Sequence, residues 1–160
     1  MIPYGVGSNQ FHNYYPVSTH HPSYDQINLM DYGPNPFSIN FQTATLQNDN
    51  FRTALWTGTY FQLTLMSLNP GEDIGLERHP DMDQYLRIEQ GQGLVMMGPN
   101  KENMPFKKMV SVNDIIIIPA GTWHNLINTG NVPLKLNSIY APIQHPFGTV
   151  HKTKEDAKKE

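Results

Sequence analysis

Short stretches of alternating apolar and polar residues fill the middle of the chain, and this pattern constrains its fold more than any other feature. In residues 60–68, Phe61, Leu63 and Leu65 alternate with Gln62, Thr64 and Met66. This is the two-residue period of a β-strand with one apolar face. Glycine, proline, asparagine and aspartate separate such stretches, and these residues favour turns. Many short strands with frequent turns predict an all-β barrel or sandwich.

The same criteria predict further strands along the chain. We expect them at residues 84–90, 94–97, 114–118, 122–127 and 134–140. The run Ile115 to Ile118 has the continuous apolar character of a buried strand. No segment has a convincing helical period, and residues 48–54 are the best of several weak helix candidates.

Composition divides the chain into three zones. Residues 1–36 contain no Lys or Arg and are rich in Tyr, Asn, His, Gly and Pro, which predicts an irregular, aromatic-rich N-terminal arm. Its prolines and polar residues favour disorder, whereas its aromatic residues favour an arm that wraps the domain or a neighbouring subunit. Those aromatics are Tyr4, Phe11, Tyr14, Tyr15, Tyr24 and Tyr32. Residues 37–150 are expected to form the barrel, and residues 151–160 a charged tail that is solvated and frayed.

Length, charge and composition exclude several classes of protein. A chain of 160 residues suffices for one domain with a real core. The formal net charge of -3 gives no global basic field for nucleic acid or anionic lipid. The absence of cysteine excludes disulfides, thiolate zinc sites and cysteine nucleophiles. Because no signal peptide and no stretch long enough to span a bilayer is recognisable, we expect a cytoplasmic protein without membrane or nucleic-acid partners.

Three side chains with metal-binding chemistry share one expected orientation in the first half of the barrel. Glu77 and His79 are two residues apart, so on a strand both side chains lie on one face. Gln84 has the parity of Leu86, which is an inward apolar position, whereas Asp83 has the opposite parity. We therefore expect Gln84, and not Asp83, to face the same interior as Glu77 and His79.

A fourth candidate ligand follows a proline-glycine turn in the second half. His124 shares the parity of the apolar Leu126, so it also faces inward on a regular strand. Four polar side chains inside an apolar barrel are costly unless they are paired or metal-bound. A metal site is the favoured interpretation; hydrogen bonds to Glu77 from Gln84, Arg78 or water are the alternative.

Two ordered motifs carry a resemblance to a known family. Residues 71–91 read G-x5-E-x-H-x4-Q-x6-G, and residues 119–128 read P-x-G-x2-H-x3-N. They resemble the two motifs of the cupin superfamily, G-x5-H-x-H-x3,4-E-x6-G and G-x5-P-x-G-x2-H-x3-N. The resemblance implies a small single-domain cupin with a double-stranded β-helix fold, a jelly-roll-like barrel, and a homodimer. It also implies one divalent metal ion bound by Glu77, His79, Gln84 and His124.

The chain departs from these motifs at three positions. Glu77 stands where the first histidine is usual, Gln84 where the glutamate is usual, and Asn113 where the second motif opens with glycine. The first two departures offset each other, because two imidazoles, a carboxylate and an amide carry the same single negative charge as three imidazoles and a carboxylate. That charge suits a divalent cation, and two histidines with a carboxylate fit Fe, Mn, Ni or Zn. The amide of Gln84 is the weaker ligand and could give its place to water or substrate.

The resemblance leaves two functional classes open, because cupins host many chemistries. One is a metal-dependent enzyme on a small organic or sugar substrate, either dioxygenase-like or isomerase-like. The alternative is a non-catalytic cupin that binds a carbohydrate or metabolite or serves in structural assembly. A sugar-phosphate substrate requires basic residues, and the sequence gives no clear inward position to Arg52, Arg78 or Arg87. No role is assigned to His145 or His151, which lie beyond the last predicted strand.

Overall fold

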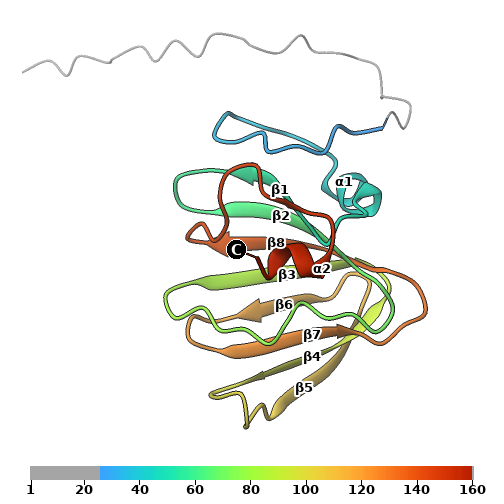
Figure 1. Ribbon diagram of the computed structural model, residues 1–160, viewed down its shortest axis with the longest axis vertical. Helices are drawn as coiled ribbons and strands as arrows, with labels where there is room; N and C mark the ends of the chain where they lie inside the picture. The colour runs from blue at the N-terminus through green and yellow to red at the C-terminus, as the bar shows by residue number, and fades with distance from the viewer. Residues whose placement is uncertain (1–25, 160) are drawn as a thin grey trace, which may run out of the picture.

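A computed structural model describes residues 26–159, and its regular structure is almost entirely antiparallel β-sheet (Figure 1). A larger sheet has the strand order β6-β3-β8-β2-β1-β9, and a smaller sheet has the order β5-β4-β7. The strands are β1 (Arg52–Thr57), β2 (Gln62–Leu68), β3 (Asp83–Gln90), β4 (Gln92–Gly98), β5 (Phe106–Ser111), β6 (Ile115–Ile118), β7 (Trp123–Asn128), β8 (Leu134–Ala141) and β9 (Val150–His151). The prediction of an all-β domain is confirmed. Neither helix in this part of the chain is long and apolar enough to cross a membrane.

The helix prediction for residues 48–54 is wrong, because residues 52–57 form β1 and pair with both β2 and β9. The first helix, α1 (Phe41–Gln47), lies just before this segment. It begins where the Asn40 side chain accepts a hydrogen bond of 3.0 Å from the backbone N–H of Thr43, which satisfies a free donor of the first helical turn. The pairing of β1 between two strands is a tertiary effect that overrides a weak local preference.

One face of the larger sheet is apolar at one end and polar at the other. At the polar end, Tyr140 of β8 lies opposite Gln62 of β2 and Gln84 of β3. Farther along β8, Leu136 lies between apolar residues of the same two strands and belongs to the main core. That core is closed by Val95, Val110 and Leu126 of the smaller sheet, together with other buried residues. The barrel interior therefore has an apolar base and a polar end.

The outer face of the larger sheet carries a second core. Leu55 of β1 and Leu65 of β2 pack there with Ala44 of α1 and with side chains from residues 27–41. Residues 26–36 of the predicted arm thus lie against the sheet, and the Tyr32 N–H donates to the Leu55 carbonyl at 2.9 Å. This part of the arm supports the wrapping alternative for its own domain. The arm aromatics outside the described residues are Tyr4, Phe11, Tyr14, Tyr15 and Tyr24.

Residues 150–157 differ from the frayed tail that the charged composition predicts. β9 pairs with β1, and a short helix follows, α2 (Lys154–Ala157). The Thr153 and Asp156 side chains cap the start of α2 reciprocally, which is a capping box. Lys154 forms an ion pair of 2.8 Å with Asp73. Strand pairing, a helix cap and an ion pair hold this segment against the barrel, where Figure 1 shows α2 in front of β3 and β8.

The third departure from the cupin motifs has a backbone explanation. Asn113 adopts a φ of 72°, in the left-handed region. Glycine enters this region at no steric cost, and asparagine enters it more readily than most other residues. The Asn113 side chain also accepts a hydrogen bond of 3.2 Å from Arg87. Asparagine therefore supplies the turn that glycine makes in the motif.

Candidate metal centre

The loop before β3 places Glu77 directly opposite His124 of β7. The two residues exchange backbone hydrogen bonds, from Glu77 N–H to the His124 carbonyl at 3.1 Å and from His124 N–H to the Glu77 carbonyl at 2.9 Å. Residues that face each other across antiparallel strands have side chains on one side of the sheet. The Gly121 N–H then donates to the His79 carbonyl at 2.7 Å, which holds His79 beside the same strand end.

Three of the predicted ligands converge on one point. Ligand atoms of Glu77, His79 and His124 all lie within 4.8 Å of one another. Glu77 Oε1 is 3.4 Å from His124 Nε2 and 3.5 Å from His79 Nε2. Within residues 26–159, none of these three atoms has a hydrogen-bond partner of good geometry, although all are buried. A buried polar atom without a partner costs about 1–3 kcal/mol, so a divalent cation bound between them fits this donor set.

The neighbouring backbone fixes the tautomer of His124. Its Nδ1 lies 2.9 Å from the carbonyl oxygen of Thr122. A carbonyl can only accept, so Nδ1 carries the proton. In the neutral ring this leaves the lone pair of Nε2 facing Glu77 and His79. Such a bond from the second ring nitrogen is a common feature of metal-binding histidines.

Gln84 faces the interior, as its parity predicts, and it is 2% exposed. Its Nε2 donates to Ser138 Oγ at 3.3 Å. Its Oε1 is buried and has no hydrogen-bond partner among the described residues. The amide is thus oriented with the oxygen available, and its role as a fourth ligand stays a prediction.

The carboxyl group of Glu77 is strongly acidic in the metal-free protein. Burial raises its pKa, but the imidazoles of His124 and His79 outweigh burial and lower the pKa from 4.5 to about 2. Because the pKa falls on folding, the ionised carboxylate contributes stability that is complete above a pH of about 4.5 and is lost as the pH falls toward about 2. We expect the Glu77 carboxyl carbon in metal-free protein to keep the NMR chemical shift range of an ionised carboxylate from pH 7 to pH 4. A titration midpoint at or above pH 4 would contradict this.

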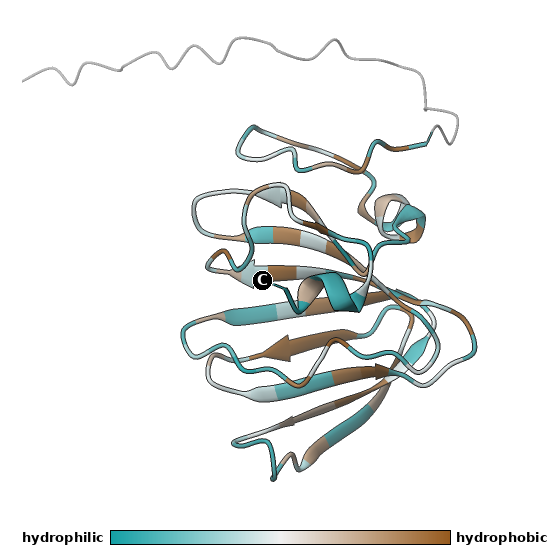
Figure 2. Cartoon of the chain, viewed as in Figure 1, coloured by the Kyte–Doolittle hydropathy of each residue, from teal (hydrophilic) through white to brown (hydrophobic). Residues whose placement is uncertain are grey.

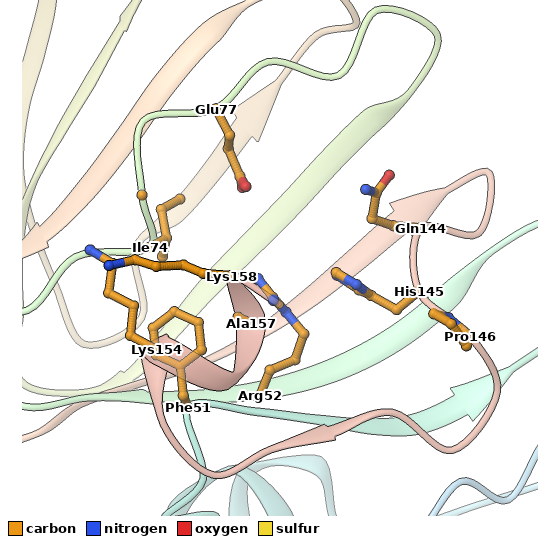
Figure 3. Close-up of a pocket in the computed structure, with 11 residues that line it drawn as sticks. Phe51, Arg52, Ile74, Glu77, Gln144, His145, Pro146, Lys154, Ala157 and Lys158 are labelled. Carbon is orange, nitrogen blue, oxygen red and sulfur yellow. The ribbon is translucent and has the colours of Figure 1, made fainter. Parts of the chain in front are cut away.

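A pocket of about 630 Å³ adjoins Glu77 (Figure 3). Figure 3 shows the Glu77 carboxylate directed toward it from one side and the Arg52 side chain from the opposite side. The other lining residues are Phe51, Ile74, Gly75, Gln144, His145, Pro146, Lys154, Ala157 and Lys158. Of the three converging residues, Glu77 lines this pocket, and its side chain is 27% exposed, so the pocket adjoins the candidate centre at Glu77.

The sequence pattern assigned no clear inward position to Arg52, but the structure places this residue on the inward face of β1. Arg52 lies opposite Met66, a core residue of β2, and is 5% exposed. It was missed because β1 was not recognised as a strand, so no parity could be assigned. Arg78 is exposed, and Arg87 is paired with Glu89 at 3.3 Å.

A row of aromatic rings runs from the metal centre to the pocket. Tyr140 contacts His79 with ring centroids 6.1 Å apart and His145 with centroids 5.3 Å apart, and His145 lies 6.2 Å from His151. Gln62 holds the His145 backbone with two hydrogen bonds of 3.0 Å. Sequence spacing gave no signal for His145 or His151, because a long loop and β9 bring them back to the barrel.

Comparison with known proteins agrees with this architecture. The sequence pattern of the Cupin domain family matches residues 64–140. The chain is 64% identical over 137 residues to the uncharacterized protein YrkC of Bacillus subtilis, covering 84% of this chain and 74% of that protein. It is 44% identical over 115 residues to the uncharacterized protein L612 of Acanthamoeba polyphaga mimivirus, covering 71% of this chain and 70% of that protein.

A solved structure confirms the barrel type. The crystal structure of BH2720 from Bacillus halodurans superposes with a TM-score of 0.81 at 57% identity and covers 82% of this chain and 99% of that one. The prediction of a double-stranded β-helix is confirmed. The motifs, the antiparallel sheets and these relatives show that the chain belongs to the cupin superfamily.

Proposed function

We propose that this cupin is a metal-dependent enzyme that binds one divalent ion through Glu77, His79 and His124 and acts on a small organic molecule in the adjoining pocket. The convergence of three buried ligand atoms that lack hydrogen-bond partners among the described residues carries this proposal. The apolar base of the barrel provides no other partner for them. Fe, Mn, Ni and Zn all suit this ligand set.

The environment of the three ligands supports catalysis more than a purely structural ion. Structural metal sites are closed by protein ligands, whereas catalytic sites keep open positions. Here three ligands converge and a pocket reaches Glu77. A bound metal would act there as a Lewis acid or oxygen-activating centre. The hydrogen bond to Thr122 would hold the His124 ring in place. A non-catalytic metabolite-binding cupin is the alternative.

Metal analysis of protein purified without a His tag tests the proposal. We expect about one ion per chain after reconstitution with Fe(II), Mn(II), Ni(II) or Zn(II). After substitution with Co(II), the protein should show a visible absorption spectrum typical of cobalt bound by nitrogen and oxygen ligands. Arg78→Ala is the matched control, because Arg78 lies between Glu77 and His79 but is exposed. Sub-stoichiometric binding of every ion would refute the metal site. Oxygen uptake and isomerisation assays with small substrates then separate an enzyme from a binder.

We also propose that the protein forms a homodimer through the outer surface around β6. β6 is an edge strand of the larger sheet, and Figure 2 shows it apolar along its length. The run Ile115 to Ile118 was predicted to be a buried strand, but only one face of β6 is buried. Ile115 and Ile117, on the other face, are 56% and 54% exposed. Adjacent exposed apolar residues on an edge strand are typical of an interface.

The variant Ile117→Lys is therefore expected to convert dimer to monomer in analytical ultracentrifugation, because a charge would be buried at the interface. Val132→Lys, at an exposed apolar residue outside β6, should leave the dimer intact. A monomeric wild type, or an Ile117→Lys variant that remains dimeric, would contradict the proposal.

A further inference from the structure

The pocket beside the metal centre has a cationic lining. Arg52, Lys154 and Lys158 all line it, and Glu77 is the one carboxylate residue among its lining residues. The Lys154 charge is partly compensated by Asp73 at 2.8 Å. Lys158 is exposed and forms no ion pair within residues 26–159. The binding of a divalent ion by Glu77 would add to this positive charge.

Arg52 is the unusual member of this lining. It is 5% exposed, yet among the described residues no carboxylate lies within ion-pair distance of its guanidinium. Its Nε has no hydrogen-bond partner there, and its Nη2 contact is a weak one of 4.0 Å to Met66 Sδ. A buried charge is costly unless it is paired. Arginine is well suited to bind a carboxylate or phosphate with two parallel hydrogen bonds.

The polar end of the barrel connects Arg52 to the metal centre. Tyr140 contacts the His79 ring and also interacts with Arg52, whose charge opposes the rise that burial causes in the pKa of Tyr140. Figure 3 shows the Arg52 side chain pointing into the pocket from the side opposite Glu77. Arg52 and Glu77 thus lie at opposite sides of one pocket, so a small molecule bound there can contact the guanidinium at one end and lie beside Glu77 at the other.

We propose that Arg52, assisted by Lys158 at the rim, is an anion subsite that binds the carboxylate or phosphate group of a small substrate whose opposite end lies at the metal centre. The placement of the other end of the substrate at the metal centre rests on the proposed function, but the anion subsite at Arg52 does not. It makes the substrate a small organic acid or phosphate ester. Arg52 also supplies the basic residue that a sugar-phosphate substrate requires, which the sequence pattern alone did not place inside the barrel.

Binding of simple anions tests the subsite in metal-loaded and in metal-free full-length protein. The probes are propionate and methyl phosphate, with propionamide as a neutral control of similar shape. NMR of arginine side chains follows the Nε–H resonance of Arg52, identified by its loss in Arg52→Lys. We expect both anions to shift this resonance and to bind at least about tenfold more tightly than propionamide. The more tightly bound anion identifies the favoured group.

Variants complete the test. Arg52→Gln should weaken anion binding at least about tenfold, and Lys158→Ala about two- to fivefold, because an exposed charge contributes less. Lys101→Ala is the matched control, since Lys101 is exposed and does not line the pocket. If Arg52→Gln does not fold, the test is the shift of the Arg52 Nε–H resonance on addition of anion, measured in wild type and in Lys158→Ala.

Two results would overturn the subsite. One is equal binding of propionate and propionamide, and the other is an Arg52 resonance that saturating anion leaves unchanged. Anion binding by Arg52 in a protein that binds no metal would retain the subsite and refute the proposed function. Metal binding without anion binding would refute the subsite and leave the proposed function standing.

Discussion

Replacement of His124 by alanine is expected to reduce bound metal from about one ion per chain to less than about one tenth under the same dialysis conditions. His124 is the most buried of the converging ligands, at 1% exposed. Its ring is oriented by the bond from Nδ1 to Thr122. Loss of an outer partner of a metal ligand already costs 10- to 100-fold in affinity, so loss of the ligand itself should cost more. Metal analysis by mass spectrometry after dialysis measures the effect.

The control must separate loss of a ligand from loss of the fold. Thermal unfolding of metal-free wild type and metal-free His124→Ala shows whether the variant remains folded. Arg78→Ala, which changes an exposed neighbour of two ligands, should keep the full metal content. If folded His124→Ala retained a full equivalent of metal, His124 would not be a ligand, and the proposed centre would be wrong.

Replacement of Asp31 by alanine is expected to lower the free energy of unfolding by about 3 kcal/mol or more. The Asp31 carboxylate is buried and accepts four hydrogen bonds. They come from Gly33 N–H at 3.0 Å, Thr57 N–H at 2.9 Å, Thr57 Oγ1 at 2.6 Å and Gly148 N–H at 2.9 Å. Alanine would leave these donors without their acceptor. Urea unfolding followed by circular dichroism measures the change.

Two variants define the specificity of this effect. Asp31→Asn keeps the shape but replaces one acceptor oxygen by a donor, so it should lose about half as much stability. Asp81→Ala, at an exposed position, should change stability by less than about 0.5 kcal/mol. An Asp31→Ala protein as stable as wild type would show that the N-terminal segment and the loop near Gly148 do not depend on this carboxylate.

The strands that carry the motifs could be predicted because their burial follows a local pattern. Gln84 alternates with exposed or half-buried neighbours on β3, and His124 does so on β7, so parity alone gave their orientation. β1 escaped prediction because neither face of its first residues is exposed. One face packs on the barrel interior and the other on the second core. A strand buried on both faces loses the alternation that identifies it.

The helix α1 escaped prediction for a related reason. α1 has only seven residues, and so short a helix has little intrinsic stability. It is stabilised by the Asn40 cap and by the burial of Ala44 against Leu55 and Leu65. That burial requires the sheet to be in place.

The strand expected at Glu77 and His79 is absent, because both residues lie in the loop before β3. The sequence by itself determined the all-β class and the inward direction of Gln84 and His124. These properties depend on residue spacing, and spacing fixes the face of a strand on which a side chain lies. Only the tertiary structure decided which candidate ligands meet, and it brings Glu77, His79 and His124 together. It also decided that Arg52 and the segment after β8 complete the pocket. Those contacts join residues far apart in the chain, and their position depends on strand register and pairing, which no local pattern encodes.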